Sequence, residues 1–392
     1  MYQTYKPRPT NRDIWVYDRS ITQVGLISEY ESLFMERNNT GIGRFALTLP
    51  VSAEDANKLQ DDLIICLGQS DARAGIVQRI ELDRERGPKY VVVEGRMLKG
   101  LVHRRIVVPP TATEDPAALG WDRVNGAAEE VYRHYVDRHI VNPTDPNRKL
   151  SGVVLDALAD PPRGIVTPWQ CKHDERLENV LPEIGAWTDM GWDMRLDLRN
   201  KSIVFVVIPG RDKSKGNAEG NSPVIFSEGF GNIIVSRFLV DRGEFVNAPY
   251  IGGAGEDENQ LVLSAYVDDD GQQLEGPLTG WDRREGWISG GNEDDPAQLI
   301  TTGLQKLRDG WKYIRGLEAQ VTHTGSFKYG IDWDVGDRVT AIVDVLGKRL
   351  RLDVRVTMAR EIYERSSTTV EVTLGSSALE LKDRILELQK RR

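Results

Sequence analysis

The first part of the chain alternates apolar and polar residues with a period of two, which is the pattern of β-strands. Turn residues separate these runs at short intervals as far as about residue 108. Between Pro109 and about Gly191 the apolar positions recur every three or four residues, as they do in helices. The alternation then returns and continues to Gly375. We therefore predict two β domains with a mixed α/β region between them.

Two β-rich segments share one pattern at a distance of about 275 positions (337 minus 62). The first runs from Asp62 to Gly95 and the second from Gly336 to Gly375. Each has an acidic turn, a strand, a second strand with charged outer positions, a polar turn and a third strand closed by glycine. Either a duplicated small barrel or the general similarity of antiparallel meanders explains this. A trimer of a duplicated chain would present six similar units around one axis.

Three helices are expected. The first has one apolar face made of Val124, Ala127, Ala128, Val131, Tyr135 and Val136. The second starts at Asp174 and contains Pro182, which should kink or shorten it. The third starts at Asp295-Pro296 and must be held by packing, because Gly303 and Gly310 weaken it. The Lys-, Ser-, Gly- and Asn-rich segment 210–221 is predicted to be a mobile loop.

The last 17 residues predict a short helix. It opens with a capping box at Ser377–Glu380, and its apolar residues follow heptad spacing. We expect Leu381, Ile385 and Leu388 to lie at an oligomer interface, packed against symmetry mates or against the preceding β domain. The predicted fold is thus a β-rich α+β multidomain protein with two small β-barrels related by an internal pseudo-repeat. Its predicted domains are 1–108, 109–230, 231–375 with a helix inserted near 296–315, and the helix 376–392.

Composition narrows the functional classes. The net charge is 51 minus 60, or −9, which argues against a generic nucleic-acid-binding surface. Cys66 and Cys171 lie far apart in sequence and are expected to be reduced thiols. The N-terminus has no apolar signal core, and the longest strongly apolar run, Ile203–Ile208, is too short to cross a bilayer. No stable membrane insertion is expected.

A search for chemistry finds no catalytic, cofactor-binding or metal-binding set. The five histidines lack metal-site spacing, and His134 and His139, five residues apart, should diverge on a helix. Asp268–Gly271 is typical of a hairpin turn, and the glycine run 252–255 of a tight loop. We therefore predict that the chain is not an enzyme and needs no cofactor.

A second functional class stays open at this point. Tryptophans and acidic clusters are compatible with a carbohydrate- or cell-wall-binding tail protein with hydrolase activity. The tryptophans in question are Trp121, Trp169, Trp187, Trp192, Trp281, Trp287, Trp311 and Trp333. Glycoside hydrolysis would need two carboxylates facing one groove about 5 to 9.5 Å apart. A structure can test for that groove.

The order of elements resembles that of the tail-tip hub proteins of siphophages, which are related to the central baseplate hub of contractile tails. The resemblance spans nearly the whole chain, and its motifs mark strands and turns of a scaffold. They include Ile14–Asp18, Val24–Leu33, Glu36-Arg37, Gly43–Pro50, Ala74–Val77, Glu94–Ile106, Glu130–Pro143, Phe226–Ile233, Gly252–Glu256, Trp281–Glu285 and Tyr329–Val339.

This resemblance implies a structural hub in the virion, at the tail tip. Such a hub would be a homotrimer with a pseudo-sixfold ring around an axial channel, assembled in the host cytoplasm. Its implied partners are the distal tail protein ring, the tape measure protein, tail fibre or receptor-binding proteins, and DNA that passes without specific binding. Because the chain stops at Arg392, we expect no appended peptidase or lysozyme-like domain.

Overall fold

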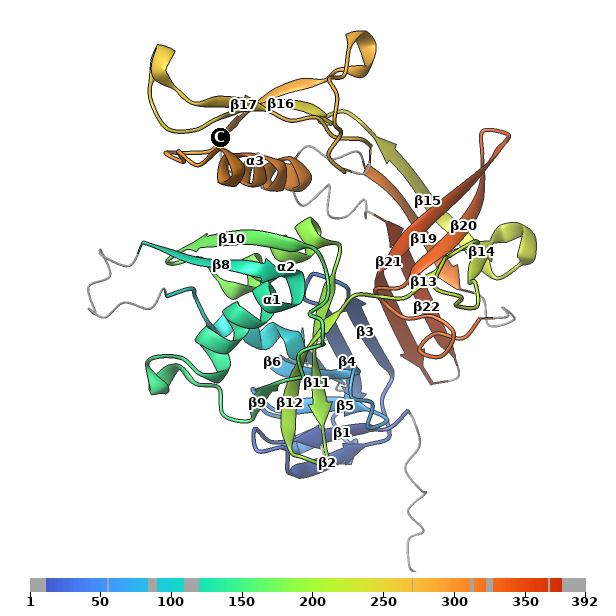
Figure 1. Ribbon diagram of the computed structural model, residues 1–392. Coiled ribbons are helices and arrows are strands. Elements are labelled where there is room, and N and C mark those ends of the chain that lie inside the picture. Colours follow the sequence, from blue (N-terminus) through green and yellow to red (C-terminus); the bar gives the residue numbers. More distant parts are fainter. Residues whose placement is uncertain are drawn as a thin grey trace, which may run out of the picture.

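Antiparallel strands dominate the fold, and helices cluster in its middle and in one projecting arm (Figure 1). The computed structural model describes residues 12–54, 56–83, 90–108, 120–269, 271–310, 314–321, 327–365 and 367–375. The predicted interface residues Leu381, Ile385 and Leu388 lie outside the described residues. The coarse prediction of a β-rich α+β protein is confirmed.

The N-terminal β domain consists of seven strands. They are β1 (Ile14–Tyr17), β2 (Gln23–Ile27), β3 (Ser32–Asn38), β4 (Arg44–Pro50), β5 (Ile64–Leu67), β6 (Ala74–Asp83) and β7 (Tyr90–Met97), with the 3-10 helices η1 (Ala56–Lys58) and η2 (Leu98–Arg104). Alternation explains β4, where Phe45, Leu47 and Leu49 are buried and Arg44 is exposed. The buried residues of these strands form one core.

The C-terminal β domain contains β15 (Ile233–Asp241), β19 (Ile314–Val321), β20 (Arg338–Val345), β21 (Lys348–Glu364) and β22 (Thr368–Gly375). Two short strands, β13 (Asp212–Lys213) and β14 (Ile225–Ser227), pair in parallel with β20. Its core surrounds Trp333, which meets Phe226 edge to face at 5.3 Å between ring centroids.

The two β domains have the same strand order. The N-terminal order is β3-β4-β7-β6-β5 and the C-terminal order is β15-β19-β22-β21-β20. Each second strand of the meander carries a register shift at the same place, after Val77 in β6 and after Val356 in β21. Val77 exchanges backbone hydrogen bonds with Asp62 and Leu63, and Val356 does so with Gly336 and Asp337. Val77 and Val356 are therefore equivalent positions.

One strand pairing joins the two domains. Met358–Glu364 of β21 pairs antiparallel with Ser32–Asn38 of β3, so both domains belong to one 14-stranded sheet. In the part of the chain that the structure describes, no sheet closes into a barrel.

The middle region places three helical segments between small sheets. Its elements are β8 (Trp121–Ala127), α1 (Ala128–Val136), the π-helix η4 (Asp137–Val141), η5 (Pro146–Arg148), β9 (Val153–Leu155), β10 (Val166–Lys172), α2 (Leu177–Thr188), β11 (Gly191–Asp197) and β12 (Ser202–Ile208). The prediction that Val124 and Ala127 lie in the first helix is wrong, because both belong to β8, which pairs with β10. The second helix begins at Leu177, three residues after the predicted start, and contains Pro182.

A projecting arm is inserted between β15 and β19. It consists of the sheet β17-β16-β18, from β16 (Ala248–Gly252), β17 (Val262–Ser264) and β18 (Glu285–Ser289), with α3 (Pro296–Gly310) packed on it (Figure 1). Short turns η6 (Glu228–Phe230), η7 (Asp257–Asn259) and η8 (Gly280–Asp282) complete the chain. The third predicted helix is confirmed.

The segment 210–221 is an ordered loop, contrary to the prediction of mobility. Asn217 Nδ2 donates to the carbonyls of Ser214 and Asn221, and Asn221 Nδ2 donates to that of Asp212. These amide side chains close the loop against itself. No helix among the described residues is long and apolar enough to span a membrane.

Candidate functional site

The junction between the two β domains is the best candidate for a functional site, because three parts of the chain meet there. The turn after β3 reaches both other parts: Asn39 N donates to Thr357 O of β21, and Trp192 N of β11 donates to Asn39 O. The indole of Trp192 donates to Thr40 O at 2.7 Å. One tight turn thus fixes the N-terminal domain against the C-terminal domain and the middle region.

Lys99 is buried at the centre of this junction. Its ammonium donates to three backbone carbonyls, those of Asn38 (2.9 Å), Asn39 (3.2 Å) and Trp192 (2.7 Å). It also lies 4.3 Å from the centroid of the Trp192 ring, in cation–π contact. Burial lowers the pKa of Lys99 to about 7, although Asp193 opposes the shift. Lys99 serves as a three-way clamp between segments distant in sequence.

Arg37 forms a second buried contact between all three parts. Its guanidinium donates to Asp334 Oδ1 at 2.7 Å and to the Tyr329 hydroxyl at 2.9 Å, and it lies 3.6 Å from Asp193. Burial alone would lower the pKa of Arg37, but these partners outweigh it and the pKa lies well above its usual value. Arg37 therefore stays charged.

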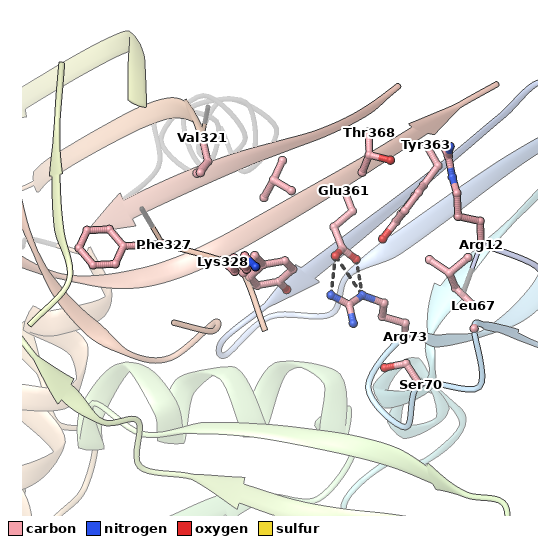
Figure 2. Close-up of a pocket in the computed structure, with 13 residues that line it drawn as sticks. Arg12, Leu67, Ser70, Arg73, Val321, Phe327, Lys328, Glu361, Tyr363 and Thr368 are labelled. Atoms are coloured by element: carbon pink, nitrogen blue, oxygen red, sulfur yellow. Dashed lines mark hydrogen bonds and ion pairs between the residues drawn. The ribbon is translucent and has the colours of Figure 1, made fainter. Parts of the chain in front are cut away.

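A cavity of about 510 Å³ lies beside this junction. Figure 2 shows Glu361 and Arg73 meeting in it, and Arg73 forms a two-pronged ion pair with both Glu361 oxygens at 2.6 Å. The wall also contains the aromatic residues Phe327, Tyr329 and Tyr363. Burial raises the pKa of Tyr329 and of Tyr363, so both phenols are neutral.

The chemistry of this cavity does not fit hydrolysis. Glu361 is the one carboxylate among the lining residues that the structure describes, and Arg73 occupies both of its oxygens. Glycosidases need a second carboxylate across the groove. The arrangement can hold two domains together, since a fixed ion pair is a structural contact.

The tryptophans do not line a common groove. Trp192 and Trp333 are fully buried, Trp169 and Trp187 are buried, and Trp121, Trp281 and Trp287 are exposed on separate elements. Trp311 lies outside the described residues. Most of the described set therefore belongs to cores.

A buried histidine cluster corrects one prediction. His134 Nε2 lies 2.8 Å from Asp122 Oδ1 and His139 Nε2 lies 3.4 Å from Asp122 Oδ2, so the two histidines converge. The π-helix η4 explains this, because Asn142 N donates to Asp137 O and the wider turn brings residues five apart to one side. Burial would raise the pKa of Asp122, but the bond from His134 and the charge of Arg138 outweigh it and lower the pKa. No group of three potential metal ligands occurs among the described residues.

The residues of the junction were not predicted as a site. Several lie in motifs on which the resemblance rests: Arg37 in Glu36-Arg37, Lys99 in Glu94–Ile106, and Tyr329 and Asp334 in Tyr329–Val339. A lysine between apolar residues was the one local signal for Lys99. Cys66 and Cys171, expected as reduced thiols, are free and buried.

Comparisons with known proteins agree with the fold and with the resemblance. Residues 13–376 match the family described as Siphovirus ReqiPepy6 Gp37-like protein. No curated protein matches.

Three solved structures have the same fold. The prophage tail protein gp18 from Listeria monocytogenes EGD-e has a TM-score of 0.56 at 10% identity, covering 96% of this chain and 98% of its own. The 43 kDa tail protein of prophage MuSo2 from Shewanella oneidensis has a TM-score of 0.55 at 12% identity, covering 93% and 97%. The tail protein from Neisseria meningitidis MC58 has a TM-score of 0.54 at 14% identity, covering 93% and 97%. With the family match over most of its length, the chain belongs to the Siphovirus ReqiPepy6 Gp37-like family.

Proposed function

We propose that this chain is the structural hub of a phage or phage-like tail tip, and that it acts as a homotrimer. The observation that carries the proposal is the shared strand order of the two β domains, β3-β4-β7-β6-β5 and β15-β19-β22-β21-β20. Three chains with two equivalent modules each present six modules around one axis, which matches a sixfold tail ring. The family and the tail-protein fold support this role.

The two modules are proposed to be small barrels related by internal duplication. The proposed domains keep the bounds 1–108, 109–230, 231–375 and 376–392. The register shifts after Val77 and Val356 support the duplication, because a bulge at one place in two unrelated meanders would be a coincidence. The buried clamps at Lys99 and Arg37 would hold the modules of one chain at a fixed angle.

Within the tail, the ring would join the distal tail protein to the tip and enclose or plug the DNA exit channel. The tape measure protein and tail fibre or receptor-binding proteins are the further proposed partners, and the virion tail tip is the proposed location. The net charge of −9 suits a channel that DNA passes without binding tightly.

Catalysis is not part of the proposed role. We expect the purified chain to produce no clearing on peptidoglycan or polysaccharide gels. Clearing by the wild-type chain that Glu361→Gln abolishes would overturn this and favour the wall-degrading alternative. Glu361 is the carboxylate to change because it is the one that lines the junction cavity among the described residues.

The native mass tests the trimer. Three chains of 44.1 kDa give about 132 kDa (3 × 44.1). Light scattering after gel filtration should give this mass, and electron microscopy should show a ring of six lobes. A monomer or dimer over a wide range of protein concentration would contradict the proposal.

A further inference from the structure

Two strands of the described fold have one edge without a strand partner, and both edges are partly apolar. Strand β6 pairs with β7 along its length, but β5 covers only Ala74–Ile76 of its other edge. Beyond that point Ile80 and Leu82 are 41% and 42% exposed. Uncovered edges of this kind are usually protected or paired with another chain.

The second such edge is β15, which pairs among the described strands only with β19. Its Val240 is 47% exposed, and Phe238 is partly buried against the core of the C-terminal domain. β15 stands at one end of the 14-stranded sheet.

The internal duplication relates these edges to the junction inside the chain. In the strand order of the two modules, β6 corresponds to β21 and β15 corresponds to β3. Inside the chain, β21 pairs with β3 through Met358–Glu364. The equivalent pairing, β6 with β15, is missing within one chain. It is the pairing that the next chain of a ring would supply.

The register of this pairing follows from the equivalent positions. Val77 and Val356 are equivalent, so a residue of β21 corresponds to the β6 residue 279 positions earlier (356 minus 77). Met35 and Phe238 are equivalent because each is two strands away from the residue opposite that valine: Met35 faces Phe45, which faces Gly95, and Phe238 faces Leu317, which faces Leu374. The observed pair of Glu361 with Met35 thus translates into Leu82 with Phe238.

From this starting point the antiparallel register places Ile80 opposite Val240 and Arg79 opposite Asp241. Ile80 and Leu82 share the face of their partners Val93 and Val91 in β7, which is the core face of the N-terminal domain. Phe238 likewise shares the core face of Leu317. The pairing would therefore continue the apolar face of one module into that of the next.

The charged pair adds specificity. The Arg79 side chain is 63% exposed and pairs within its own chain with Glu81 and Glu94. Asp241 opposite it would add a third carboxylate to this guanidinium from the neighbouring chain. Apolar residues meet apolar ones and a cation meets an anion, although no part of the derivation used side-chain type.

We propose that Arg79–Leu82 of β6 pairs antiparallel with Phe238–Asp241 of β15 in a second copy of this chain. This rests on the proposed trimer and gives its interface. Each chain offers one edge of each kind, so the contact is head-to-tail and closes into a ring of three.

A cysteine pair tests the register. In an antiparallel pair the Cα atoms of opposite residues are about 4.5 to 5.5 Å apart, which is within disulfide range. The double variant Ile80→Cys, Val240→Cys should, on mild oxidation, give disulfide-linked dimers and then a covalent trimer on non-reducing gels, and no larger species. The matched control is Ile80→Cys, Ile234→Cys, because Ile234 is an exposed residue of β15 that is 57% exposed but six positions away. The control should stay uncrosslinked at equal oxidation.

The outcomes separate the interface from the function. A native mass of about 132 kDa (3 × 44.1) without a cross-link at 80 and 240, or equal cross-linking of the control, overturns the interface and leaves the trimer standing. A ladder of ever larger cross-linked species keeps the strand pairing but contradicts the closed trimer. A chain that remains monomeric and forms no cross-link across the concentration series overturns both.

Discussion

Individual charged residues hold this molecule together where its parts meet. Lys99, Arg37 and the pair of Arg73 with Glu361 are buried or half-buried, and each bridges segments far apart in sequence. Buried charges cost free energy unless they are fully paired, so loss of one partner should be felt strongly. Two predictions follow from these residues.

The first prediction concerns Lys99 and pH. Its pKa is lowered to about 7 in the folded chain from an ordinary 10.5, so between those values the unfolded chain binds a proton that the folded chain does not. Stability from this group therefore rises with pH across that window, by about 1.4 kcal/mol per unit for one proton. The variant Lys99→Met should lose that slope.

The measurement is urea unfolding of both chains from pH 6.5 to 10. The difference between them isolates Lys99, because Cys66 and Cys171 have raised pKa values that act in the opposite direction in both chains. Parallel stability curves would show that Lys99 keeps its proton in the fold.

The second prediction compares a buried ion pair with an exposed one. Glu361→Gln leaves Arg73 without its charged partner and should lower the free energy of unfolding by about 3 kcal/mol. The control Asp344→Asn breaks the pair with Arg349, whose side chains are 63% and 72% exposed, and should cost less than about 1 kcal/mol. Equal effects in chemical unfolding would mean that the junction pair is not a structural contact.

At the scale of elements, sequence patterns predicted type better than bounds. The alternation of β4 and the capped third helix were readable because one local rule decided each of them. Val124 and Ala127 fit the apolar face of a helix, yet pairing with β10 makes them part of β8. The convergence of His134 and His139 depends on the π-helix η4, which no residue spacing signals. The junction was equally invisible, because Lys99 and Arg37 acquire their roles only when distant segments meet.

The third prediction concerns the packing of α3 on β16. Alanine normally stabilises a helix by about 1 kcal/mol over glycine. A Cβ at Gly303 would lie 2.3 Å from Ile251 Cδ1, so Gly303→Ala should instead lower stability, by about 1 to 3 kcal/mol. Thermal unfolding measures this. Gly276→Ala, where nothing lies within 4 Å, is the control and should be near neutral. A stabilising Gly303→Ala would mean that α3 does not press on the sheet.

At the scale of the whole molecule, the two β domains form a chain with an unpaired edge on either module. A strand pairing joins them internally, and the same geometry repeated between chains generates a ring. The arm carrying α3 breaks the equivalence, because it is inserted between β15 and β19, where the N-terminal module has only a short turn between β3 and β4. Six modules of two alternating kinds can therefore bind threefold partners on the side of the arm and sixfold partners elsewhere.

The last prediction concerns the C-terminal segment 376–392, which lies outside the described residues and is argued from its sequence. A helix of about 14 residues is marginal alone in water, so the heptad residues Leu381, Ile385 and Leu388 need a protein partner. Burying each leucine contributes about 1.5 to 3 kcal/mol per chain. Leu381→Asp with Ile385→Asp should weaken the trimer or unfold the C-terminus, measured as native mass and melting temperature. Lys390→Asp changes the charge by the same two units on the opposite helical face and is the control. If the double variant kept the mass and melting temperature of the wild-type chain, the helix would contribute nothing to assembly, and the strand edges of β6 and β15 would have to hold the ring alone.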